Sequence, residues 1–149
     1  MAFKFKYMLN GAANPTIIDW PVAASQTISI GDTLQLSSGL AAAGAEAQAD
    51  FIGVAATAIT TGVSVTDADT VKVIHPIGAV FEADYAGTSL TDPTSANLGT
   101  AFDLAASSAS QIDLDDVDGG AWVFIDLAHL DTTNKKMYVT CKASKTIFG

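Results

Sequence analysis

The stretch Ala121-Trp122-Val123-Phe124-Ile125-Asp126-Leu127 decides the fold class, because it is an almost unbroken run of aromatic, β-branched and aliphatic residues. Residues of these types are enriched in strands, and the run shows no helical periodicity, so it predicts a central buried strand. A polar segment at Asp131–Asn134 follows, and the strand-like segment Lys136–Lys142 comes directly after it. We therefore expect the two segments to form a hairpin.

Shorter runs of the same kind recur towards the N-terminus, each ended by Gly, Pro, Asp, Asn or Ser. They occupy residues 16–20, 26–30, 33–36, 51–56, 70–75 and 79–83. Strands at this spacing predict an all-β sandwich or barrel. Two alanine-rich stretches, residues 40–49 and 101–107, are alternatives for short helices, because alanine is the best helix former. The expected fold is a single compact β-barrel or β-sandwich domain with at most one or two short helices.

The chain of 149 residues fits one domain. We expect an extended N-terminal arm over residues 1–15 and one β domain over residues 16–149. Within that domain, residues 84–120 have few strand signals and predict a long, loop-rich insertion, and long loops are commonly functional or mobile.

Aromatic and basic residues alternate near the N-terminus. They are Phe3, Lys4, Phe5, Lys6 and Tyr7. An arm of this kind can add as a strand to the open sheet edge of a partner. The alternative is an ordinary first strand of the domain.

The charge balance argues against nucleic acid as a partner. The chain has 7 basic and 16 acidic residues, a net charge of -9, and all its basic residues are Lys. Arg is the residue type that most often reads phosphates and bases. No stretch approaches the roughly 18 apolar residues of a membrane span, and no signal-peptide pattern is visible, so we expect a soluble protein made in a cytoplasm, with no membrane partner.

Nearly all lysines lie close to the two ends of the chain. They are Lys4, Lys6, Lys135, Lys136, Lys142 and Lys145, with only Lys72 between them. If the termini meet, these residues would form a basic pole that could orient on an acidic partner. The alternative is that the lysines protect edge strands from unwanted pairing.

No catalytic motif is present: the chain lacks a nucleophile elbow, a phosphate-binding loop and a zinc-binding His-Glu-x-x-His helix. His75 and His129 each stand alone among apolar residues or at a strand end. Cys141, the only cysteine, lies in an apolar run and is expected to behave as a small buried hydrophobe. We expect neither an enzyme nor a cofactor.

One acidic cluster is a candidate cation site. It consists of Asp113, Asp115, Asp116 and Asp118. Carboxylate oxygens are ligands that Ca²⁺ prefers, but Val117 stands at the fifth position of the calcium-loop pattern and Phe124 at the twelfth. We therefore expect an acidic, solvent-exposed turn, with a bound cation as the alternative.

Several short motifs together resemble the head decoration, or capsid cement, proteins of tailed bacteriophages. They are Ile28–Leu34 with its Gly31-Asp32 turn, Gly39–Ala41, Phe51–Ala55, Val71–Val73 and Gly78–Phe81. The similarity covers roughly residues 26–83, and Trp122–Val139 looks like the closing hairpin of such a domain. Residues 84–120 match no part of the pattern.

The resemblance implies a β-barrel-like or β-tulip-like module on the outer surface of the virion, synthesised in the host cytoplasm. It also implies binding to the major capsid protein and to further copies of itself, often as a trimer, with the N-terminal arm along the shell. The expected interface residues are then the Phe3–Tyr7 strip with Lys135, Lys136, Lys142 and Lys145. Alternatives are another virion part, such as a tail-tube, fibre-base or minor head protein, or a carbohydrate-binding module.

Overall fold

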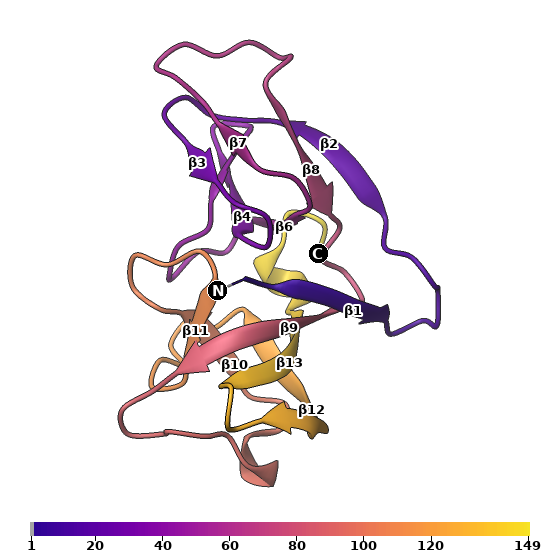
Figure 1. The fold of residues 1–149 in the computed structure, drawn as a ribbon, viewed down its shortest axis with the longest axis vertical. Helices are drawn as coiled ribbons and strands as arrows, with labels where there is room; N and C mark the ends of the chain where they lie inside the picture. Colours follow the sequence, from indigo (N-terminus) through magenta and orange to yellow (C-terminus); the bar gives the residue numbers. More distant parts are fainter. Residues whose placement is uncertain (1) are drawn as a thin grey trace.

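The computed structural model describes residues 2–149, which form strands β1 to β13 (Figure 1). The predicted all-β fold class is confirmed. Within residues 2–149 the only helical segments are the 3-10 turns η1 (Ser95–Asn97) and η2 (Ala143–Lys145). The strands form two groups, seen in Figure 1 with β2 to β8 above and with β1 and β9 to β13 below.

The lower group is a closed barrel of five strands. In order around the ring they are β9 (Ala79–Ala86), β11 (Gln111–Asp113), β10 (Ala101–Leu104), β12 (Trp122–Asp131) and β13 (Lys136–Cys141). The ring closes because β13 pairs again with β9. Neighbours are antiparallel except β9 and β11, which run parallel and therefore need a long connection between them.

The upper group is a five-stranded antiparallel sheet. Its order is β2 (Ile17–Pro21), β8 (Thr70–Ile74), β6 (Phe51–Ala55), β4 (Thr33–Ser37) and β5 (Leu40–Ala43). The sheet rolls up, because Val22 and Ala41 form a parallel bridge between the segments at its two edges. A short ribbon of β3 (Thr27–Ile28) and β7 (Ile59–Thr60) completes this half.

Two hydrophobic cores fill the two groups, and β6 is buried between them. Phe51 and Val54 belong to the barrel core, whereas Ile52 and Ala55 belong to the core of the upper sheet. The change of face within β6 comes from a bulge at Gly53, where the register against β4 shifts by one residue. One strand thus serves both cores and joins the two groups into one domain.

The predicted hairpin of residues 121–127 and 136–142 is confirmed as β12 and β13. Trp122 lies opposite Cys141, and Phe124 lies opposite Val139. All four side chains point into the barrel core. Burying a large apolar side chain of this kind contributes about 1.5–3 kcal/mol to stability, so the hairpin is both locally encoded and firmly anchored.

The alternative of short helices in the alanine-rich stretches is wrong. Residues 40–43 form β5 and residues 101–104 form β10. Ala41 is fully buried in the upper core, and Phe102 and Leu104 are fully buried in the barrel. Burial in a sheet outweighs helix propensity, which differs between residue types by less than about 1 kcal/mol per residue.

The prediction that the N-terminal residues extend away from the domain is also wrong, because residues 4–8 form a strand of the domain. The alternative, an ordinary first strand, holds. β1 (Lys4–Met8) pairs with β9 along the edge that β11 occupies further on. Phe3 is buried in the barrel core, and its N–H donates to the carbonyl of Gly31 at 2.8 Å. The large apolar area of Phe3 favours this docked position over an extended one.

Residues 84–120 are not an insertion outside the barrel, because they contain the end of β9 and supply β10 and β11. Phe102, Leu104 and Ile112 from this segment are fully buried. Strands β10 and β11 give little strand signal in the sequence, because they are only three or four residues long and are separated by polar turns.

No helix within residues 2–149 is long and apolar enough to cross a membrane.

Candidate protein-binding interface

The outer face of β12, β13, β9 and β1 carries a mixed row of charged and aromatic side chains. The strand register places Asp126 beside Tyr138, Tyr138 beside Glu82, and Glu82 beside Lys4. Successive side chains of a strand point to opposite faces, and on β9 and β13 the residues that flank Glu82 and Tyr138 belong to the barrel core. We call this surface the β1–β9–β13–β12 face.

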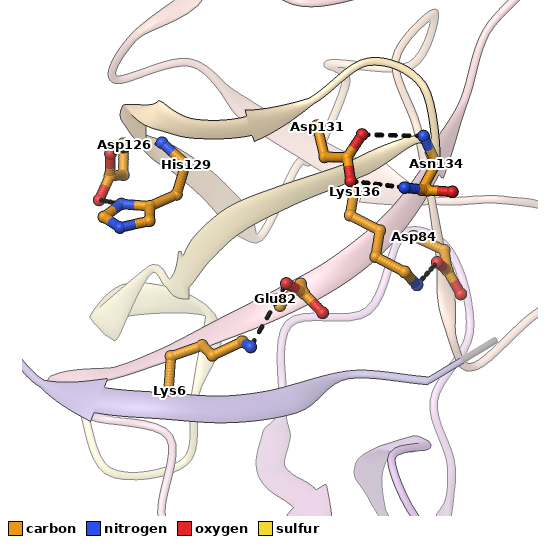
Figure 2. Close-up of polar contacts among 8 residues, drawn as sticks. All are labelled: Lys6, Glu82, Asp84, Asp126, His129, Asp131, Asn134 and Lys136. Carbon is orange, nitrogen blue, oxygen red and sulfur yellow. Dashed lines mark hydrogen bonds and ion pairs between the residues drawn. The ribbon is translucent and has the colours of Figure 1, made fainter.

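A second row runs parallel to the first and holds an ion pair. Lys136 Nζ lies 2.5 Å from Asp84 Oδ1 (Figure 2). The Ala2 N–H donates to Asp84 Oδ2 at 3.2 Å. The hydrogen bond to Asp84 raises the pKa of Lys136 above its ordinary value. On β1, Lys6 Nζ lies 3.4 Å from Glu82 Oε2, so cations from both flanking strands converge on the carboxylates of β9.

Tyr138 is the centre of an aromatic cluster on this face. The His129 ring stacks on it with centroids 4.8 Å apart and an interplanar angle of 6°. Tyr7 approaches to 6.2 Å, and Lys6 Nζ lies 5.7 Å from the Tyr138 ring centroid. Cations near aromatic rings and offset ring pairs are both attractive, so side chains from three strands are held in fixed positions.

Asp126 connects the same cluster by hydrogen bonds. Its Oδ2 lies 2.8 Å from His129 Nδ1, and the Tyr7 hydroxyl donates to Oδ2 at 3.5 Å. Burial alone would raise the pKa of Asp126, but the hydrogen bonds from His129 outweigh burial and lower it. Burial, together with the nearby Asp126 carboxylate, raises the pKa of Tyr7.

The structure brings only some of the predicted interface residues to this face. Lys4, Lys6, Tyr7 and Lys136 lie on it. Phe3 is buried in the barrel core, and Phe5 is half-buried against it. The expected interface role is wrong for the Phe3 ring, because its apolar area is buried within the barrel.

The remaining predicted lysines lie elsewhere. Lys135 sits in the β12–β13 turn, where its Nζ is 2.7 Å from Asp92 Oδ1. Lys142 and Lys145 lie in and beside η2 near the C-terminus. The predicted basic pole is therefore broken up, since Lys6, Lys135 and Lys136 are each neutralised by a carboxylate.

Five members of the face were not predicted as interface residues from the sequence. They are Glu82, Asp84, Asp126, His129 and Tyr138. The alternation of β13 did contain a signal, because it puts Tyr138 on the same side as Lys136. Which acids of β9 and β12 lie beside them depends on the register between distant strands, which no local pattern encodes.

The acidic cluster forms turns instead of a metal site. Asp115 accepts hydrogen bonds from the backbone N–H groups of Thr88, Ser89 and Leu90, and also from the Thr88 hydroxyl. These bonds, led by the one from Leu90, hold the pKa of Asp115 far below its ordinary value. The carboxylate therefore closes the loop after β9.

Two other aspartates of the cluster have similar local roles. Asp113 accepts from the N–H of Asp115, and Asp116 accepts from the N–H of Asp118. Within residues 2–149 no three His, Cys, Asp or Glu side chains are grouped so that they could hold a metal ion. The expected acidic turn is what this segment forms, and the calcium alternative has no ligand set in this structure.

Burial shifts the pKa of two residues, Cys141, which is buried, and His75, which is half-buried. Burial raises the pKa of the Cys141 thiol to about 12, in keeping with its place in the barrel core. Burial also lowers the pKa of His75, whose ring packs on Phe148 with centroids 4.2 Å apart. Tyr85 and Phe102, the aromatic residues of the segment 84–120, are buried, so this segment presents neither ring to a carbohydrate.

A comparison with protein-family models gives no match, and a comparison with curated protein sequences gives none either.

Proposed function

We propose that this chain is a structural virion protein that binds the outside of a phage capsid and stabilises the shell. The proposed partners are the major capsid protein and further copies of the chain, and the proposed location is the outer capsid surface. The motif resemblance over residues 26–83 supports the capsid as partner. No catalytic role belongs to this proposal.

The observation that carries the proposal is the β1–β9–β13–β12 face. Tyrosine is enriched among the residues that dominate protein–protein binding energy, and two tyrosines lie together here, Tyr7 and Tyr138. Their neighbours His129, Asp126 and Lys6 already hold them in place. A surface ordered before binding loses less conformational entropy when a partner docks.

The charges on this face favour a specific orientation of the partner. Lys136 and Asp84 form a pair that is partly shielded from water, and Lys4 is exposed at the end of the neighbouring row. Charge pairs at an interface contribute to specificity and association rate more than to affinity. Lys142 and Lys145 add two cations near the C-terminus for an acidic patch of the shell.

Small contacts of this kind become strong when they are repeated. A trimer that docks three identical faces at once would convert later binding steps into intramolecular ones and raise the overall affinity by avidity. This gives a mechanical function to the closed five-stranded barrel, which transmits load between neighbouring capsid subunits.

The test is co-sedimentation of the purified chain with capsids of the encoding phage that lack it. A Tyr7→Ala, Tyr138→Ala double variant should weaken binding by about 30-fold or more, the loss expected of a hot spot of about 2 kcal/mol. The matched control is Val63→Ser, which changes an exposed residue in the upper group of strands. Equal binding by the double variant and the control would exclude this face as the interface.

Counting copies per particle tests the capsid assignment separately. A decoration protein is present in numbers close to those of the capsid protein, whereas a fibre-base or minor head protein is present in few copies. If the chain is present in few copies per particle and the Tyr7→Ala, Tyr138→Ala variant binds as well as the parent, the result favours a fibre-base or minor head protein.

A further inference from the structure

The connection between β1 and β2 contains an exposed Asn-Gly pair. Asn10 and Gly11 lie in an excursion from the molecule that Figure 1 shows at the side, after the arrowhead of β1. Leu9, the preceding residue, is 59% exposed, and residues 10–14 are exposed as well. Water and hydroxide therefore reach this peptide freely.

The turn folds the asparagine side chain over the next peptide. The Gly11 N–H donates to the Met8 carbonyl at 3.0 Å, and the Ala12 N–H donates to Asn10 Oδ1 at 2.9 Å. The second bond closes a turn in which the Asn10 side chain folds over the Gly11 peptide. Gly11 has φ +82°, and apart from its two chain neighbours no atom lies within 4 Å of where a Cβ would stand, so no side chain crowds the approach to its nitrogen. The one hydrogen bond of that nitrogen, to Met8, has to open before the nitrogen can react.

We propose that Asn10 is a site of spontaneous deamidation assisted by the Gly11 backbone. The Gly11 nitrogen gives up its proton and attacks Cγ of Asn10, forming a C–N bond. The bond from Cγ to the side-chain nitrogen then breaks, and ammonia leaves with the proton. Water opens the resulting five-membered imide at either carbonyl, which yields aspartate or isoaspartate, and no oxidant or reductant is needed.

None of the other three asparagines of the chain is followed by a glycine. Asn14 precedes Pro15, whose nitrogen carries no proton to give up. Asn97 Oδ1 accepts from the Thr94 N–H at 2.8 Å, and Asn134 Nδ2 donates to Asp131 Oδ2 at 2.7 Å. Both are followed by residues with long side chains, Leu98 and Lys135, which crowd the attacking nitrogen.

The reaction adds one negative charge beside the end of β1, and isoaspartate also inserts a methylene into the backbone there. Neither change reaches the barrel core, because residues 9–14 make their contacts at the surface. The product should therefore stay folded while the connection next to Tyr7 and Met8 changes its charge and length.

The experiment incubates the purified full-length chain at mildly alkaline pH and follows it by intact mass and peptide mapping. We expect a gain of one mass unit that maps to Asn10 alone, with isoaspartate detected there by enzymatic methylation. Gly11→Ala, whose methyl group meets no neighbouring atom but crowds the nitrogen and disfavours the φ of +82°, should slow the conversion several-fold, and Asn10→Gln should abolish it. The proposal is overturned if Asn10 stays intact, if another asparagine converts faster, or if Gly11→Ala converts at the same rate.

Discussion

The ring of Phe3 packs against the indole of Trp122, with ring centroids 4.7 Å apart. Phe3 precedes the first strand and Trp122 begins β12, so this contact joins the N-terminus to the middle of the barrel. Phe51 of the upper sheet reaches the same indole at 5.5 Å. The N-terminal segment is thus part of the core that connects the two groups of strands.

The first prediction follows from this contact. Phe3→Ala should lower the free energy of unfolding by about 3 kcal/mol, because it leaves a cavity beside Trp122. Urea unfolding monitored by tryptophan fluorescence measures the change. Phe148→Ala is the matched control, since Phe148 is 39% exposed and should cost much less. Equal losses in the two variants would mean that Phe3 is not held in the core.

The bulge of β6 gives the second prediction. Gly53 has φ +142°, and a Cβ there would collide with the Ile74 carbonyl oxygen and the Val73 side chain. Gly53→Ala should therefore cost about 3 kcal/mol or more through strain and overpacking.

Gly62→Ala is the control for this substitution, because no atom lies within 4 Å of its Cβ position. It should change the free energy of unfolding by less than about 0.5 kcal/mol. A Gly53→Ala variant as stable as Gly62→Ala would show that the bulge is absent in solution.

Asp115 gives a prediction on pH. Its pKa is depressed in the folded state by backbone donors at Thr88, Ser89 and Leu90. The stability that the ionised Asp115 carboxylate contributes is therefore fully present above the pKa of about 3.9 that an aspartate has in the unfolded chain. It is lost as the pH falls through the lower pKa of Asp115 in the folded state. Asp115→Asn should lower the melting temperature at neutral pH, and the gap from the parent should narrow in strong acid.

Asp118→Asn serves as the charge-matched control. It removes the same charge from the same turn, but among residues 2–149 its carboxylate accepts no hydrogen bond. This variant should melt close to the parent at neutral pH. If both variants lose the same stability, the loss comes from the change in net charge and not from the hydrogen bonds that Asp115 accepts.

The fourth prediction concerns Cys141. Its thiol is 5% exposed, and burial raises its pKa to about 12, so almost no thiolate is available at neutral pH. Native protein should resist a thiol reagent such as Ellman's, and full reactivity should appear in parallel with urea unfolding. Ser144→Cys, in the exposed η2 turn, should react at once in the native state. Rapid labelling of Cys141 without denaturant would contradict the closed barrel.

Several elements could be predicted because their signals are local. The β12–β13 hairpin could be predicted, since two strong strand segments are joined by a short polar turn. Strands β10 and β11 could not be predicted, because three or four residues between polar turns carry little periodicity. On the candidate face, Lys4, Lys6 and Tyr7 belong to the aromatic and basic strip that the sequence shows, and Lys136 belongs to the lysines near the chain ends. The residues that hold them, Glu82 and Asp84 among them, were not predicted as interface residues.

The sequence by itself determined the all-β class, the hairpin and the apolar character of Cys141, because strand preference and turn chemistry act between residues close together in the chain. Only the tertiary structure decided that Phe3 enters the core, that β13 closes the ring on β9, and that Lys136 faces Asp84. Those relationships depend on register between strands far apart in sequence. Register is set by which apolar sets can be buried together, and that is a property of the whole packed barrel.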